Sequence, residues 1–187
     1  MKLLIYIICC FYAISSYAQK AKKSHNNDTD ETTATFELRE VALLDLEPSN
    51  ATVRLDIVSP KEAGKKAEVV TTNNNKWINF SSAVSDDTAS RSISIEIEDG
   101  QVPPGIYLKL GISNYVGSGD GVLGSAVSRV TLNNTSQTIV SGIRGAYTGN
   151  GENNGYKLSY NLEIYDYKLL DFDQSATLNI SLTLSDL

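Results

Sequence analysis

Apolar and polar residues alternate along most of this chain, and the alternation is most regular in two runs. In residues 156–164, tyrosine, leucine and isoleucine occupy every second position, with lysine, serine, asparagine and glutamate between them. Residues 176–184 repeat the pattern with serine, threonine and asparagine as the polar members. A period of two gives a strand one dry face and one wet face. The two runs therefore predict long scaffold strands, and we expect no functional site on their dry faces.

Shorter runs of the same kind predict further strands upstream. They cover residues 51–57, 67–71, 77–84, 93–97 and 106–112, with weaker runs at 130–132 and 139–143, and proline, glycine, asparagine or aspartate separates most of them. Residues 36–46 are apolar but irregular, which fits a strand that bulges or changes sheets, or a short helix over 37–45. About nine strands without an ordinary amphipathic helix predict an all-β fold. We expect a single antiparallel β-sandwich over residues 36–187, with a closed barrel as the alternative.

The first 35 residues have a different character. Lys2 precedes an apolar run over residues 3–14, and Ser16 and Ala18 are small, which predicts a cleaved signal peptide at 1–18. An uncleaved anchor and a lipoprotein are the alternatives for this segment. Residues 19–35 are almost wholly polar, which predicts a disordered arm. We therefore expect an exported bacterial protein (periplasmic, cell-surface or extracellular) with no membrane span after signal cleavage.

The amino-acid composition argues against several classes of partner and of catalytic mechanism. The net charge of −6 argues against nucleic acid as a partner. Both cysteines lie in the predicted signal peptide and the only histidine, His25, lies in the predicted arm, which argues against a Ser/His/Asp or Cys/His mechanism and a histidine zinc site. A pair of carboxylates for glycoside hydrolysis is the most distant alternative, because the acidic residues lie in predicted loops. We predict no enzyme and no catalytic residue.

Candidate ligand residues gather in the predicted loops. Residues 117–155 hold nine of the thirteen glycines and predict two flexible loops, at 117–121 and 149–155. Tyrosines at the strand ends and one aspartate between glycines are candidates for binding polysaccharide: Tyr115, Asp120, Tyr147, Tyr165 and Tyr167. Three acids between the last two strands, Asp166, Asp171 and Asp173, are candidates for calcium, the one cofactor we consider. Trp77 is either a core residue or an exposed binding aromatic.

Three stretches resemble a group of bacterial secreted proteins. The sequence Gly-Tyr-Lys-Leu-Ser-Tyr-Asn-Leu at 155–162, the strand at 176–184 and the Gly-, Ser-, Thr- and Asn-rich residues 113–155 resemble pilin-like sandwiches of the spore-coat-protein-U and fimbrial-subunit type. The resemblance implies an immunoglobulin-like sandwich that assembles with copies of itself or related surface subunits by strand addition. The donor strand would be Phe36–Leu46. A structural or adhesive subunit is thus the first hypothesis, and an autonomous module that binds carbohydrate or calcium is the alternative.

Overall fold

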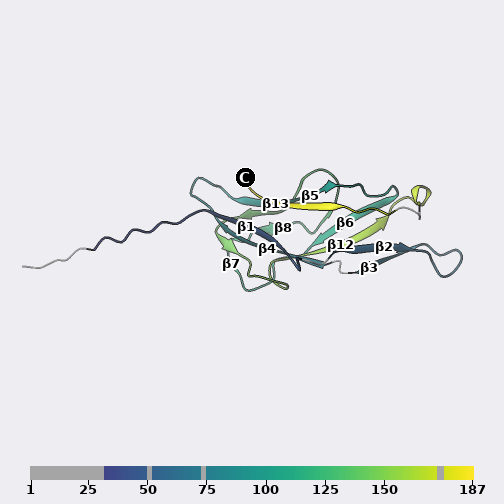
Figure 1. Ribbon diagram of the computed structural model, residues 1–187, viewed down its shortest axis with the longest axis horizontal. Helices are drawn as coiled ribbons and strands as arrows, with labels where there is room; N and C mark the ends of the chain where they lie inside the picture. Colours follow the sequence, from purple (N-terminus) through teal and green to yellow (C-terminus); the bar gives the residue numbers. More distant parts are fainter. Residues whose placement is uncertain (1–31, 50–51, 73–74, 172–174) are drawn as a thin grey trace, which may run out of the picture. The chain divides into compact units, whose positions relative to one another are not determined.

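The computed structural model describes residues 32–49, 52–72, 75–171 and 175–187 (Figure 1). The predicted signal peptide, residues 19–31 of the predicted arm and Asp173 lie outside these ranges. The chain divides into two compact units, Met1–Glu37 and Leu38–Leu187. In the first unit, residues 32–37 have no regular secondary structure. The architecture below is that of the second unit.

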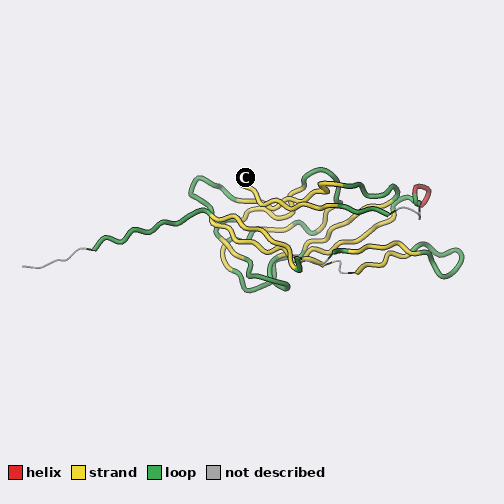
Figure 2. The backbone as a smooth tube through the Cα atoms, in the orientation of Figure 1, coloured by secondary structure: helices red, strands yellow, loops and turns green. Residues whose placement is uncertain are grey.

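The second unit is all-β (Figure 2). Its described residues form thirteen strands and a single 3-10 turn: β1 Val41–Glu47, β2 Arg54–Val58, β3 Glu68–Thr72, β4 Asn75–Ala83, β5 Arg91–Asp99, β6 Ile106–Ile112, β7 Asp120–Gly121, β8 Ser125–Ala126, β9 Arg129–Thr131, β10 Gln137–Ile143, β11 Ala146–Tyr147, β12 Tyr156–Ile164, η2 Tyr167–Leu169 and β13 Asn179–Asp186. The expected count of about nine is too low chiefly because three strands have only two residues. The helix considered for residues 37–45 is wrong, since β1 occupies most of that segment.

The strands form three antiparallel sheets. In the seven-stranded sheet, β1 runs along one edge of β4, and β11 and β12 share the other edge. The strand β7 continues from β11, and β6 and then β9 continue from β12. The second sheet has the order β13-β5-β10-β8, and β2 pairs with β3 alone. None of these sheets closes on itself within the described chain, so the closed-barrel alternative is wrong.

One hydrophobic core takes side chains from both large sheets. The seven-stranded sheet contributes Ile78, Leu110 and Leu158, and the four-stranded sheet contributes Ile93 and Ile139, all fully buried. Because side chains alternate between the faces of a strand, the core residues of β4, β5, β6 and β12 lie two positions apart along each strand. The strands β12 and β13 follow one another in sequence but lie in different sheets. Trp77 is buried at 9% exposure, so the structure does not present it as a binding aromatic.

The two flanks of the core are closed differently. On one flank the chain crosses from β8, in the four-stranded sheet, to β9, in the seven-stranded sheet, and backbone hydrogen bonds of 3.0 Å hold the crossing on both sides. On the other flank Arg91 of β5 donates to carboxylates at Glu40 and Asp186 and to the carbonyls of Val41 and Ala83. Arg91 therefore ties β5, β13, β1 and β4 together. The core also opens into a cleft, which Leu46 of β1 helps to line.

Candidate functional site

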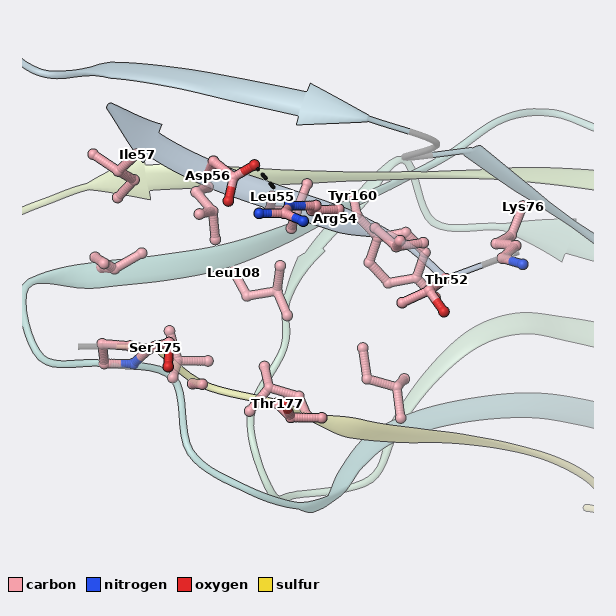
Figure 3. Close-up of a pocket in the computed structure, with 18 of the residues that line it drawn as sticks. Thr52, Arg54, Leu55, Asp56, Ile57, Lys76, Leu108, Tyr160, Ser175 and Thr177 are labelled. Atoms are coloured by element: carbon pink, nitrogen blue, oxygen red, sulfur yellow. Dashed lines mark hydrogen bonds and ion pairs between the residues drawn. The ribbon is translucent and has the colours of Figure 1, made fainter. Parts of the chain in front are cut away.

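A cleft of about 970 Å³ opens between the sheets (Figure 3). This volume lies at the upper end of the range found for small-molecule pockets. Its lining comes from β2, β6, β12 and the chain that enters β13, from one residue each of β1, β4 and β13, and from nearby loops: Leu46, Thr52, Val53, Arg54, Leu55, Asp56, Ile57, Lys76, Val102, Pro103, Ile106, Leu108, Tyr160, Leu162, Leu170, Asp171, Ser175, Ala176, Thr177, Leu178 and Ile180.

The two side walls of the cleft run along β2 and along the residues that lead into β13. Six consecutive residues, 52–57, line one wall, and four consecutive residues, 175–178, line the other. A strand that presents its face contributes every second residue, whereas a strand that presents its edge contributes each residue in turn. The strand β2 pairs with β3 and β13 pairs with β5; within the described ranges, neither has a second strand partner. The unpaired edge of β2 therefore faces the residues that lead into β13.

The floor of the cleft is an apolar sheet face. Ile106 and Leu108 of β6 and Tyr160 and Leu162 of β12 line it, two positions apart on each strand. Leu108 and Leu162 are register partners, so these side chains lie side by side across the two strands. Figure 3 shows Leu108 between β2 on one side and Ser175 and Thr177 on the other. The cleft thus combines backbone hydrogen-bonding groups along its walls with hydrophobic side chains below.

Four charged residues are among the described residues that line the cleft: Arg54, Asp56, Lys76 and Asp171. The Nζ of Lys76, a residue that is 7% exposed, donates to the carbonyl of Pro48. At the rim, Arg54 and Asp56 form an exposed ion pair with an N···O distance of 3.1 Å. Among the described residues, no cluster of three or more histidine, cysteine or acidic side chains could hold a metal ion.

Two tyrosines of β12 carry pKa values raised by burial. Burial raises the pKa of Tyr160, in the cleft floor, from 10.0 to about 12. Burial, and then the neighbouring Tyr115, raise the pKa of Tyr156 to about 12 as well. In both cases the apolar surroundings disfavour the charged phenolate.

The raised pKa values predict a loss of stability at high pH. Below pH 10 the two phenols are neutral in both the folded and the unfolded chain, and their stabilising effect is complete. Between pH 10 and 12 the unfolded chain releases the protons while the folded chain keeps them, so the midpoint of thermal unfolding should fall. Circular dichroism melts from pH 8 to 12 should show a shallower fall for Tyr160→Phe. Parallel curves for the parent and the variant would contradict this assignment.

Three of the five predicted ligand residues, Tyr115, Asp120 and Tyr147, lie together around β11 and the loops beside it. Tyr147 of β11 and Asp120 of β7 are register partners. The hydroxyl of Tyr115 donates to the carbonyl of Thr148 at 3.0 Å and accepts from the amide of Gly119 at 2.5 Å. Tyr115 packs edge-on against Tyr156, so it supports the loops from within, whereas Tyr147 is 53% exposed.

The two loops predicted to be flexible are tied to each other and to β4. The side chain of Asn154 accepts from the amide of Ser118 at 3.2 Å. Asn79 of β4, itself buried, donates to the carbonyl of Asn154 at 2.7 Å and accepts from the amide of Gly151 at 2.6 Å. Glycine allows two backbone segments to approach closely here, because a Cβ on Gly155 would overlap the carbonyl oxygen of Ile78.

The remaining predicted ligand and metal residues are dispersed. Tyr165 stacks on Tyr107 with 4.2 Å between ring centroids, and the hydroxyl of Tyr167 accepts from the amide of Ala67 at 2.8 Å. Asp166 caps η2, where its side chain accepts from the amide of Lys168 at 2.9 Å. Asp171 lines the cleft, and Asp173 lies outside the described residues. Because Asp173 is not among the described residues, the calcium site predicted from the sequence stays a prediction.

The cleft itself lies where the sequence pattern predicts scaffold alone. Tyr160, Leu162, Leu178 and Ile180 belong to the dry faces of the two most regular strands, where we expected no site. Their alternation identifies them as inward-facing. It does not indicate that these side chains line an open cleft instead of being covered by other side chains.

Comparison with protein-family models, with curated proteins and with solved structures finds no match to this chain. Within the described ranges, no helix has the length and apolar character needed to cross a membrane.

Proposed function

We propose that this chain is an exported, non-enzymatic β-sandwich protein of immunoglobulin-like, pilin-like build. Its role is structural or adhesive, and it assembles with other copies by accepting a β-strand into the cleft. The observation that carries the proposal is the cleft between the edge of β2 and residues 175–178, above an apolar floor. An added strand requires both of these features, an unpaired strand edge and an apolar floor.

Strand addition uses the two kinds of surface that the cleft offers. An unpaired edge supplies main-chain donors and acceptors, and an apolar floor receives every second side chain of the added strand. The six lining residues of the wall along β2, two ahead of the strand and four within it, would span about 20 Å in extended form at about 3.3 Å per residue. A donor of five or six residues would span that length.

The donor segment proposed from the sequence, Phe36–Leu46, is only partly available. Residues 41–47 pair with β4 along their whole length, so they complete their own sheet. Residues 32–40 belong to no strand, and within them Ala34, Phe36 and Leu38 occupy alternate positions. Phe36 is 87% exposed and Leu38 is 97% exposed. Large apolar side chains at strand spacing and without cover are suited to a partner, so we assign residues 34–38 of a second copy as the donor.

The proposal predicts assembly that depends on Phe36 and Leu38. Sedimentation velocity of the chain without residues 1–18 should show oligomers that grow with protein concentration. The double variant Phe36→Ser/Leu38→Ser should remain monomeric and should melt at the same temperature as its parent, because both side chains are exposed. Ala176→Trp, at an exposed position of the cleft lining, should also block assembly by filling the cleft.

A matched control is Leu169→Ser, which removes an exposed leucine outside the cleft lining and should leave assembly unchanged. A parent chain that is monomeric at every concentration would refute strand-mediated assembly. Oligomers that survive both the double variant and Ala176→Trp would refute the donor and the cleft together.

A further inference from the structure

A second surface, independent of the cleft, crosses four strands of the seven-stranded sheet. Register pairs Leu43 of β1 with Ser81 of β4, Ser81 with Tyr147 of β11, and Tyr147 with Asp120 of β7. We call Leu43, Ser81, Tyr147 and Asp120 the outer row. Phe80, the neighbour of Ser81, belongs to the core, so Ser81 and its register partners lie on the opposite face of the sheet.

The outer row places a small residue between two large exposed ones. Leu43 is 63% exposed and Tyr147 is 53% exposed. Neighbouring strands lie about 4.8 Å apart, so the backbones that carry these two residues are about 10 Å apart, with Ser81 between them. That spacing leaves room above the small side chain of Ser81. A flat ring a few ångströms thick could lie there and contact an apolar side chain of the outer row.

The backbone around Tyr147 is held rigidly. Thr148, which is fully buried, donates its amide to the carbonyl of Phe80 at 3.0 Å, and its Oγ1 accepts from the amide of Phe80 at 2.9 Å. On the other side, a Cβ on Gly119 would overlap the carbonyl oxygen of Tyr147, which shows how closely the two loop backbones approach. A surface ordered before binding loses little conformational entropy when a ligand arrives.

From this geometry we infer that the outer row binds neutral carbohydrate. The C–H groups of a sugar ring carry partial positive charge and are attracted to the negative face of an aromatic ring, here Tyr147. Asp120 and Ser81 supply oxygen atoms that hydrogen-bond to sugar hydroxyls. Asp45, exposed on the same face of β1, and Asp120 disfavour an anionic polysaccharide, as does the net charge of −6.

Two other exposed tyrosines, Tyr107 and Tyr165, lack the open ring face that Tyr147 offers. Tyr107 and Tyr165 stack on each other at 4.2 Å, and the Nζ of Lys109 lies 4.6 Å from the centre of the Tyr107 ring. These contacts occupy ring faces that a sugar would need. Tyr165 therefore offers a matched control, since it is exposed to a similar degree as Tyr147.

The test is affinity electrophoresis in gels that contain cellulose derivatives, soluble β-glucan, glycol chitin or starch, with alginate and pectate as anionic probes. We expect at least one neutral polysaccharide to retard the purified chain. Tyr147→Ala should weaken that retardation at least tenfold and Asp120→Asn by a smaller factor, while Tyr165→Ala should leave it unchanged. Circular dichroism melts of each variant separate loss of binding from loss of folding.

Retardation by none of the neutral polysaccharides would overturn the inference. So would equal losses in Tyr147→Ala and Tyr165→Ala, or preferential binding of alginate or pectate. The inference stands apart from strand-mediated assembly: the Phe36→Ser/Leu38→Ser variant should still bind carbohydrate, because neither residue belongs to the outer row.

Discussion

Replacing Arg91 by alanine should lower the free energy of unfolding by about 3 kcal/mol, because a buried hydrogen-bonded charge is lost at a point where four strands meet. The side chain of Arg91 is 4% exposed and reaches Glu40 at 2.5 Å and Asp186 at 2.7 Å. Its removal leaves the carbonyls of Val41 and Ala83 without this donor. Urea unfolding followed by tryptophan fluorescence would measure the change.

The control is Arg54→Ala, which removes the arginine of an exposed ion pair. We expect a change within about 0.5 kcal/mol there, since exposed pairs are screened by water. If Arg91→Ala were as mild as Arg54→Ala, Arg91 would not hold the two sheets together. Glu40→Gln and Asp186→Asn should each fall between these values, because either variant leaves the other carboxylate in place.

Gly119→Ala should destabilise the fold by about 3 kcal/mol or more, through overpacking of backbone against backbone. The added methyl group would overlap the carbonyl oxygen of Tyr147 and approach the backbone of Thr148, neither of which is the end of a flexible side chain. The cost is purely steric, since Gly119 does not have the positive φ that favours glycine. Thermal and urea unfolding would measure it.

Gly145→Ala is the matched control for this substitution. Gly145 also lacks a positive φ, and a Cβ there would meet nothing within 4 Å. We expect no loss of stability and a gain of up to about 1 kcal/mol, because alanine restricts the unfolded chain. Equal losses at positions 119 and 145 would mean that glycine is needed in this region for its flexibility rather than for close packing.

Alternation predicts the long strands well. The strands β6 and β12 have the bounds that the sequence indicates, 106–112 and 156–164, since each runs through several periods of apolar and polar residues. The two-residue strands β7, β8 and β11 escape prediction because two residues cannot show a period. A glycine in the sequence does not distinguish a mobile loop from a tight backbone contact, because a residue without a Cβ is compatible with both.

The cleft could not be predicted from the sequence, because it depends on pairing between distant segments. Leu55 and Leu178 read as ordinary inward residues, and only the sheet order shows that β2 and β13 do not pair with each other. The outer row depends in the same way on the register of four strands. In contrast, Tyr147 and Asp120 could be proposed individually, as an aromatic and an acid at the ends of glycine-rich loops.

The position of β5 between β10 and β13 also has a consequence for the order of events during synthesis. Arg91 and Asp186, which face each other as register partners in the β5–β13 pairing, are 95 positions apart in sequence. At about 5–20 residues per second, a ribosome needs on the order of ten seconds to reach the second strand after finishing the first. Throughout that interval Ile93, Ile95 and Ile97 belong to a nascent strand whose later neighbour does not yet exist. The four-stranded sheet is therefore completed only after translation of β13.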